Sequence, residues 1–550
     1  RTFAVANLRW NIVMKKYLFP VLLTMIVCTA CDSSFLDIES TSADLMDDYY
    51  KTEAQIYKAL VGAYDPLQWS DCHGGYNQFM YLSDLRADDI YVGGDKGSDN
   101  FFHQMQRFQM MPIDAPTSVW ENMYTGVERC NTVIDNLPNV EDIAPALAEQ
   151  YEAEARFLRA WYYHWLWKYW GNVPYYGNVL QAPYTAKQIT PDSLYIHIMG
   201  DLDYCCEKSG GSYRLMGRPA EEEWGRVTIY AAMMLRARVV LYQNDVARFE
   251  QIYNDMTTIK NSALFMLCND YERIWTAEGE FVTNPESMNK SESIWEINHR
   301  SEGGSWGWTQ GAEGTILPKF LGVNGLDGDP EFADGWGFGP IRKQAYVMYE
   351  DGDQRRDASI LDIEARKQML QDSMGITITW AERANHTGLY NKKYTARKGY
   401  NDCPYDPELN FNNNVRVFRY SECLLNLAEV SLRLGYARPA QTNFNEVRKR
   451  AFPDEDYKAG SKHYIEVSME NIMMERRREF LGEGHRFWDL VRWSEATDVT
   501  PCNIDAILSG TDEIGAYTRT WNKNWKYMPL PSLEIDRTEG QYKLKQNPGY

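Results

Sequence analysis

One long stretch of helical sequence, residues 146–170, most constrains what this chain can fold into. It contains neither Gly nor Pro, and Gly171 and Pro174 follow it, as expected at the end of a helix. Its second half carries aromatic side chains on all sides of the helix: Trp161, Tyr162, Trp165, Trp167, Tyr169 and Trp170. A helix that is apolar all round must be buried. We therefore predict that these rings form core and helix-pair contacts and are not a ligand platform.

Further helical patterns lie on both sides of this segment. They cover residues 53–64, 119–137, 191–206, 226–242, 419–434, 440–451 and 469–480. The pair 419–434 and 440–451 has only a short turn at Gly435 between its helices and spans about 33 residues, close to the tetratricopeptide period. The chain is therefore predicted to be mostly α-helical, with several degenerate tetratricopeptide-like helix pairs.

The middle of the chain has a different character. Residues 303–339 hold 11 of the 38 glycines, about 30% of the segment against an average near 7%. The same segment contains Trp306, Trp308 and Trp336. This composition predicts ordered loops that hold aromatic faces toward solvent or a ligand.

The N-terminal residues have the pattern of a secretion signal. Residues 1–13 begin with Arg, and we interpret them as upstream sequence read in frame. Residues 14–30 predict a lipoprotein signal peptide, with two lysines before the apolar run 17–27 and small residues before Cys31. Cys31 is the predicted lipid attachment site, although Cys28 stands where a lipobox has Leu; the alternative is a soluble secreted protein. Several acyl chains on one Cys would anchor the protein firmly.

Charge and residue counts exclude some classes of function. The formal charge is −20, a field that repels phosphate backbones, so nucleic acid is not expected as a partner. The chain has 10 Cys and 8 His but neither HExxH nor paired CxxC, which gives a catalytic metal little support.

One acidic segment resembles the start of a calcium loop. Asp327, Asp329 and Glu331 have the right spacing, but Phe332 and Phe338 occupy the positions that require Gly and Glu. This excludes an EF-hand and leaves open an irregular structural calcium site; no cofactor is expected otherwise.

A series of motifs follows one order along the chain. They are Ser34-Phe35-Leu36-Asp37, Leu60-Val61-Gly62-Ala63-Tyr64, Ser83-Asp84-Leu85-Arg86-Ala87-Asp88-Asp89, Glu154-Ala155-Arg156-Phe157-Leu158-Arg159-Ala160, Tyr169-Trp170-Gly171-Asn172-Val173-Pro174, Gly225-Arg226-Val227, Arg419-Tyr420-Ser421-Glu422, Asn426-Leu427-Ala428-Glu429, Glu475-Arg476-Arg477-Arg478-Glu479-Phe480, Gly484-His485-Arg486-Phe487-Trp488-Asp489-Leu490, Leu530-Pro531 and Gln546-Asn547-Pro548-Gly549-Tyr550. With the lipobox before them, they make the chain resemble the SusD/RagB-like outer-membrane nutrient-binding lipoproteins of Bacteroidota.

The resemblance implies a fold, a place in the cell and partners. Residues 31–550 would form a single SusD-like domain, in which tetratricopeptide-like helix pairs form one side and irregular loops with short β elements the other. Its helical N-terminal part would be 44–250, its Gly- and Trp-rich variable insert about 270–410, and its helical C-terminal part 411–550. The protein would be lipid-anchored in the outer membrane and exposed at the cell surface. It would capture oligosaccharides and pass them to a SusC-like TonB-dependent barrel transporter.

Seven residues are the predicted ligand contacts. Trp69 and Tyr76 flank the loop 71–75, Asp84 and Arg86 follow it, and Trp306, Trp308 and Trp336 come from the Gly-rich insert. Aromatic rings stack on the C–H faces of sugars, and charged side chains can bind hydroxyls bidentately.

Other functions are weighed against glycan capture. A peptide or another nutrient is the alternative ligand, although it would not need solvent-facing Trp. A helical glycoside hydrolase would need two carboxylates across a cleft. The acids of the 475–489 block alternate with Arg at helical spacing and predict ion pairs, so no enzyme activity is expected. A purely structural helical-repeat adaptor would leave the Trp-rich loops without a purpose.

Overall fold

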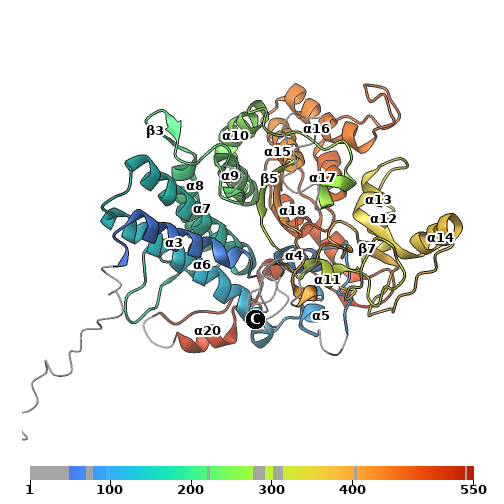
Figure 1. Ribbon diagram of the computed structural model, residues 1–550, viewed down its shortest axis with the longest axis horizontal. Helices are drawn as coiled ribbons and strands as arrows, with labels where there is room; N and C mark the ends of the chain where they lie inside the picture. Colours follow the sequence, from blue (N-terminus) through green and yellow to red (C-terminus); the bar gives the residue numbers. More distant parts are fainter. Residues whose placement is uncertain are drawn as a thin grey trace, which may run out of the picture.

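The computed structural model describes residues 49–69, 78–95, 97, 100–219, 223–276, 291–300, 314–401, 406–538 and 542–550. The predictions for residues 1–13, the signal peptide 14–30, Cys31, Tyr76, Trp306 and Trp308 lie outside these ranges. Within them the fold is mostly helical, as predicted (Figure 1).

Most helices of the N-terminal half form a stack around α7, whereas α4 and α5 lie outside it (Figure 1). The helices of this half are α3 (Glu53–Tyr64), α4 (Phe79–Leu85), α5 (Asn100–Gln106), α6 (Thr117–Asn136), α7 (Pro145–Trp170), α8 (Pro191–Cys206), α9 (Ile229–Gln243) and α10 (Phe249–Asn261). From α6 to α10 each helix packs on the next in sequence, and α3 packs on both α6 and α7. The helix-pair arrangement is therefore the one expected of tetratricopeptide-like units.

Helix α7 is the centre of this stack, and the prediction for its aromatic residues is confirmed. Trp161, Tyr162, Trp165, Trp167, Tyr169 and Trp170 are each at most 4% exposed. Close packing around α7 depends on small residues of its neighbours. A Cβ at Gly126 of α6 would lie 2.4 Å from the Tyr162 ring, so glycine there lets the two helices approach.

Local capping explains where several helices begin. The hydroxyl of Thr190 accepts a hydrogen bond from the Ser193 amide, and Pro191 occupies the first turn, so α8 covers the predicted span. Helix α9 begins three residues later than predicted. Thr228 caps it, and Gly225 has a φ of +101°, in the region that favours glycine.

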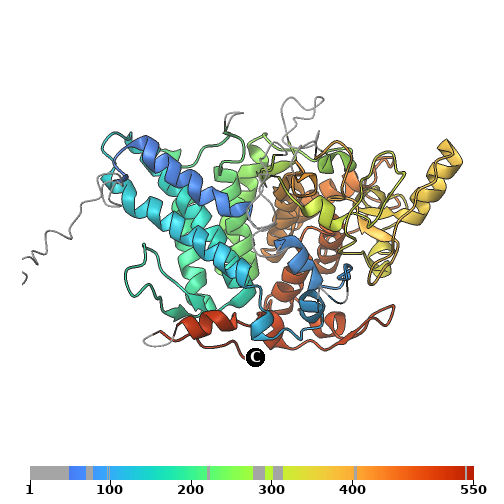
Figure 2. The same ribbon diagram turned by 60° about the horizontal axis from the view of Figure 1, so that its bottom comes forward.

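The C-terminal half supplies a second set of helices. They are α15 (Tyr420–Arg433), α16 (Ala437–Ala451), α17 (Met469–Glu479), α18 (Arg486–Ser494), α19 (Ile504–Leu508) and α20 (Ser532–Arg537). Helices α15 and α16 pack as the predicted pair, and α15 also lies against α10. In Figures 1 and 2, α4 lies beside α18 although the two are about 400 residues apart in the chain. The two ends of the chain are thus interleaved in one structure.

The middle of the chain contains more regular structure than its composition predicted. It includes α11 (Leu317–Leu321), α12 (Lys343–Tyr346), α13 (Arg355–Ser359) and α14 (Ile363–Met374). A second, small core that includes Val323, Phe332, Ile363, Leu370 and Ile378 holds α14 and its neighbouring loops together. Figure 1 shows α14 at the end of the molecule opposite α3.

The described strands are short and pair antiparallel in twos. The pairs are β1 (Val173–Pro174) with β2 (Gln188–Ile189), β3 (Lys208–Ser209) with β4 (Ser212–Tyr213), β5 (Ser293–Ile297) with β8 (Val415–Arg419), β6 (Ile360–Asp362) with β7 (Leu389–Asn391), and β9 (Gly510–Thr511) with β10 (Thr518–Arg519). All residues of β5 and β8 are buried, so this ribbon fastens the middle of the chain to its last third.

Short 3₁₀ turns connect many of these elements. They are η2 (Asp65–Leu67), η3 (Pro112–Asp114), η4 (Leu137–Asn139), η6 (Val246–Arg248), η7 (Glu272–Trp275), η10 (Pro407–Leu409) and η11 (Lys523–Lys526). None of the described helices combines the length and apolar character that crossing a membrane requires.

Candidate functional site

A surface groove of about 300 Å³ runs along α3, and we call it the α3 groove. One wall is α3 and η2, which contribute Tyr57, Tyr64 and Gln68. The other wall is the turn 224–226 and the end of β5 with Asn298. The groove therefore combines aromatic faces with side-chain amides, the two kinds of group that fix a flat, hydroxyl-rich ligand.

The turn 224–226 is held in place by β5 and the residue that follows it. The Asn298 side-chain amide donates to the Trp224 carbonyl at 2.7 Å, and the Trp295 indole donates to the Gly225 carbonyl at 3.0 Å. A Cβ at Gly225 would lie 2.6 Å from the Asn298 amide nitrogen. Glycine is thus needed for the approach of these two walls.

The α3 wall is tied to the same turn through a buried carboxylate. The Tyr64 hydroxyl donates to Glu154 at 2.6 Å and accepts from the Val227 amide at 2.9 Å. Arg226 donates to the same carboxylate at 2.6 and 3.2 Å. Burial, with the adjacent Glu154 charge, raises the pKa of Tyr64 well above its ordinary value, so its hydroxyl stays protonated as the donor. The two walls are therefore rigidly connected below the groove.

The carboxylates that line the groove are engaged with protein partners. Asp65 forms an ion pair with Arg129 at 2.7 Å. Glu296 is 1% exposed and accepts a hydrogen bond from the Asn414 amide at 2.9 Å. This arrangement suits noncovalent binding better than the pair of opposed carboxylates that glycoside hydrolysis requires.

Two segments outside the described ranges follow residues of this groove closely in the sequence. Gln68 lies two residues before residue 70, and its side chain donates to the Asn298 carbonyl at 2.6 Å. Asn298 in turn precedes residues 301–313 closely. The predicted contacts Tyr76, Trp306 and Trp308 belong to the segments 70–77 and 301–313, so they remain predictions.

Trp69 follows Gln68 and is half-buried. Its ring lies 4.7 Å from the Arg129 guanidinium, measured to the ring centroid. Arg129 also lines a groove of about 440 Å³ between α6 and α20, which we call the α6 groove. Tyr124, Tyr176 and Tyr184 line it as well. Trp69 itself is not among the residues that line either groove, and it reaches the α6 groove through its contact with Arg129.

The structure brings Asp84, Arg86 and Trp336 to neither groove. Asp84 is 3% exposed and accepts from the Gly484 amide at 3.0 Å. Arg86 is 2% exposed and donates to the backbone carbonyls of Trp525 and Lys526. Their predicted role of binding ligand hydroxyls has no support in this placement, because long-range protein contacts occupy them. Trp336 is half-buried and packs against the main core.

The segment that resembles a calcium loop is organised by an arginine. Asp329 accepts two hydrogen bonds from Arg366, both at 3.0 Å, and further ones from the amides of Glu331 and Phe332. Burial alone would raise the pKa of Asp329, but these hydrogen bonds lower it. Among the described residues, no group of three or more His, Cys, Asp or Glu side chains is placed to hold a metal ion.

Sequence reasoning did not single out the residues that line the α3 groove as ligand contacts. Tyr64 ends the motif 60–64 and Trp224 directly precedes the motif 225–227, so both stand beside sequences that carried the family resemblance. These two motifs are about 160 residues apart in the sequence. Only the folded structure shows that they come together at the α3 groove.

Comparisons with known proteins agree with this fold. The SusD family matches residues 291–550, and a family described as starch-binding and associating with the outer membrane matches residues 34–207. Surface glycan-binding protein A from Bacteroides fluxus is 40% identical and covers 91% of this chain and 100% of its own, with a TM-score of 0.78. Surface glycan-binding protein A from Bacteroides thetaiotaomicron, solved in complex with laminarihexaose, is 35% identical over 90% of this chain and 100% of its own, with a TM-score of 0.79. A SusD-like protein of Formosa agariphila is 23% identical over 86% of this chain and 88% of its own.

The fold defines a helical protein built from tetratricopeptide-like pairs, with loops and short strands on its other side. The 40% identity over nearly the whole chain then settles its relationship. This chain belongs to the SusD family.

Proposed function

We propose that this protein is a cell-surface, outer-membrane lipoprotein that captures oligosaccharides in the α3 groove. The carrying observation is the groove itself, where Tyr57, Tyr64 and Gln68 on one wall face Trp224 and Asn298 on the other around about 300 Å³. Binding energy would come from ring stacking and a few directed hydrogen bonds. No covalent step is part of this function, in line with relatives that are named as binding proteins.

The proposed ligand is an oligosaccharide of laminarin. A relative at 35% identity was solved with laminarihexaose, and another, at 27% identity, is a laminarin-binding SusD-like protein. The predicted contacts Tyr76, Trp306 and Trp308 belong to the segments that follow Gln68 and Asn298 in sequence, and they would add further rings to the site.

Calorimetry with laminarihexaose tests the ligand and the groove together. We expect Trp224→Ala, Trp306→Ala and Trp308→Ala each to weaken binding by about 5-fold or more, since a stacked ring contributes about 1 kcal/mol. Trp380→Ala, which removes a half-buried ring near α14, and Tyr184→Ala, which removes an exposed ring of the α6 groove, should bind like the wild type. Loss of affinity in Tyr184→Ala alone would move the site to the α6 groove.

The remaining steps of the proposal are anchoring and delivery. Cys31 would carry the lipid, and a SusC-like TonB-dependent barrel would receive the glycan. Fatty-acid labelling should be lost in Cys31→Ala, and affinity purification from outer membranes should recover a barrel of that class with the wild type. Failure to recover any such barrel would contradict the delivery step.

Two alternative activities have direct tests. If no glycan of a polysaccharide panel binds while peptides do, the ligand class is wrong. Release of reducing ends from laminarin would show hydrolysis, which the proposal excludes.

A further inference from the structure

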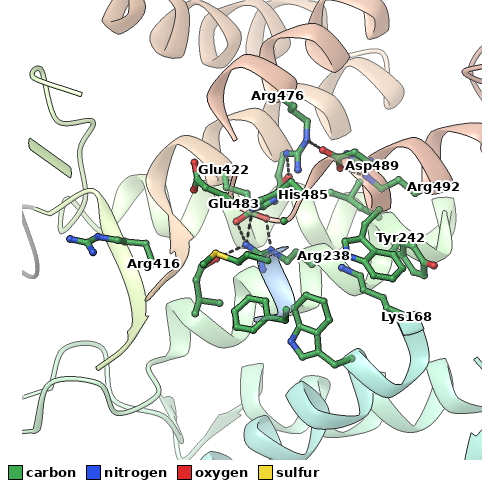
Figure 3. Close-up of a pocket in the computed structure, with 18 residues that line it drawn as sticks. Lys168, Arg238, Tyr242, Arg416, Glu422, Arg476, Glu483, His485, Asp489 and Arg492 are labelled. Carbon is green, nitrogen blue, oxygen red and sulfur yellow. Dashed lines mark hydrogen bonds and ion pairs between the residues drawn. The ribbon is translucent and has the colours of Figure 1, made fainter. Parts of the chain in front are cut away.

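A partly open, charged pocket is lined by residues of α4, α7, α9, β8, α15, α17 and α18 (Figure 3). It shares no lining residue with the α3 groove. Its volume is about 40 Å³, which is room for about three waters or one small inorganic ion at roughly 10–15 Å³ per water. Lys168 of α7 extends into this region beside Tyr242 and the guanidinium of Arg238 (Figure 3).

Lys168 is a buried cation without a carboxylate partner. It is 6% exposed, and among the described residues its amine takes part in neither an ion pair nor a hydrogen bond. Its amine lies 5.3–5.4 Å from the ring centroids of Trp165, Tyr242 and Trp488. Burial and the neighbouring Arg238 lower the pKa of Lys168 well below its ordinary value. The rings offer the ammonium cation–π contacts, and an anion in this pocket would favour the charged form of the lysine further.

Glu422 and Asp489, two acids that line the pocket, raise the pKa of Lys168, but their oxygens already accept hydrogen bonds from arginines. Both oxygens of Glu422 accept from Arg238, at 2.6 and 2.7 Å. The two oxygens of Asp489 accept from Arg476 at 2.9 Å and from Arg492 at 2.8 Å. Each carboxylate is thus already committed to guanidinium groups.

Glu483, His485 and Arg416 are the remaining charged and titratable lining residues, and Arg416 donates to the Asn414 carbonyl at 2.7 Å. Glu483 pairs with Lys393 at 2.6 Å and with Arg419 at 2.8 Å. Burial is the main cause that lowers the pKa of His485 well below its ordinary value, and the positive charge of Arg238 adds to it, so the imidazole stays neutral. The lining therefore has no acid left for Lys168.

Further lining residues present donors without acceptors. The Trp165 indole nitrogen, the Tyr242 hydroxyl and the Asn426 amide nitrogen are buried and have no hydrogen-bond partner in the protein. The carbonyl oxygen of that Asn426 amide accepts from Arg476 at 2.9 Å, so the unpaired atom is the donor. These donors need hydrogen-bond acceptors. A water molecule would also bring two donors of its own, whereas a monatomic anion only accepts hydrogen bonds.

We propose that this pocket binds a small inorganic anion of the halide class, held by the Lys168 ammonium together with donors of Trp165, Tyr242 and Asn426. The anion favours the charged form of Lys168 and joins helices from both halves of the chain. The site is separate from the glycan groove, so its test does not depend on the proposed function.

Bromide is the probe for this site. Crystals of the wild-type protein equilibrated with sodium bromide should show an anomalous bromine peak next to the Lys168 amine. Absence of that peak at saturating bromide, with water in its place, overturns the proposal in favour of a neutral lysine. The same holds for a peak that persists at this position in Lys168→Met.

Thermal unfolding gives a second readout that does not need crystals. At constant ionic strength, replacing gluconate by bromide should raise Tm of the wild type by about 1–3 °C for each tenfold increase once the site begins to fill. Lys168→Met should lose this response. Lys367→Met is the matched control, because Lys367 lies over the Trp380 ring at the surface, and it should keep the response.

Tyr242→Phe is a second test of the site in case Lys168→Met fails to fold. It removes one donor and keeps the ring that packs between Trp167 and Trp488. We expect its half-saturating bromide concentration to rise at least 3-fold. A response identical to that of the wild type in both Tyr242→Phe and Lys168→Met overturns the proposal.

Discussion

Arg419 donates a hydrogen bond to Glu479 at 3.0 Å, and both side chains are at most 1% exposed. The same carboxylate accepts from Arg355 at 3.1 Å and pairs with Arg450. One acid of α17 thus neutralises cations from β8, α13 and α16. The acids of the 475–489 block form ion pairs, as predicted, but the main partners of Glu475 and Glu479 come from other elements and not from neighbouring turns of the same helix.

Glu479→Gln should strongly destabilise the protein. An amide has the shape of the carboxylate but leaves three buried guanidinium groups short of a charge, which costs about 3–5 kcal/mol in unfolding free energy. Denaturant unfolding followed by circular dichroism measures it. Glu470→Gln, at the exposed start of the same helix, is the control and should change stability by less than about 0.5 kcal/mol. Equal effects in the two variants would contradict the role of this network.

Acid should unfold the protein through the same network. Burial alone would raise the pKa of Glu479, but Arg450, Arg419 and Arg355 hold it well below its ordinary value, and Arg355 and Arg448 similarly lower that of Glu475. A carboxyl whose folded-state pKa is depressed contributes stability above its unfolded pKa of about 4.3 and loses it as pH falls through the folded pKa. The contribution of these two carboxyls to the midpoint of urea unfolding should therefore be steady from pH 7 to about 5 and fall below that. In Glu479→Gln the fall should be smaller.

Asp84 should have the opposite pH dependence. Burial raises its pKa well above the ordinary value, and the Gly484 amide only partly offsets this. Since the folded state favours the protonated acid, stability falls as pH rises above about 3.9, the unfolded pKa. Asp84→Asn keeps an acceptor for Gly484 and carries no charge. We expect it to be at least as stable as the wild type at pH 7.5, with the difference shrinking toward pH 4, while exposed Asp454→Asn shows no such trend.

The same Asp84→Asn variant tests the sequence prediction that Asp84 binds ligand. Because the side chain is buried away from both grooves, laminarihexaose affinity should be unchanged. A clear loss of affinity in a folded, equally stable variant would restore the original prediction.

Local signals were enough to predict many of the helices. Residues 53–64 and 191–206 are helical as predicted, because each segment carries its own periodicity and begins beside a Thr that can cap it. Helix α14 was missed, since its apolar residues face only the small second core. The burial of Asp84 and Arg86 could not be read locally either. Their partners Gly484 and Trp525 lie 400 and 439 residues away in the chain.

Gly126→Ala should destabilise the contact between α6 and α7. The added methyl group would lie 2.4 Å from the Tyr162 ring, and overpacking of this kind typically costs about 1–3 kcal/mol. Gly62→Ala in α3 is the matched control, because a Cβ there meets nothing within 4 Å. Alanine in that helix should stabilise the protein by about 0.5–1 kcal/mol. Thermal unfolding should therefore shift in opposite directions, and a downward shift in both variants would show that the difference in packing does not govern the result.

Tyr64→Phe should lower both the stability of the protein and its affinity for the ligand, because it weakens the contacts below the α3 groove. The hydroxyl joins Glu154 to the Val227 amide, so its removal leaves a buried N–H without its acceptor at a cost of about 1–3 kcal/mol. The turn 224–226 then loses part of its support, and we expect the laminarihexaose Kd to rise about 2–10-fold. Tyr57→Phe, in the same wall, removes a hydroxyl that makes no hydrogen bond to the described residues, and it should leave stability unchanged. If Tyr64→Phe lowers stability but calorimetry finds an unchanged Kd, the turn is not part of the binding site and the α6 groove becomes the better location.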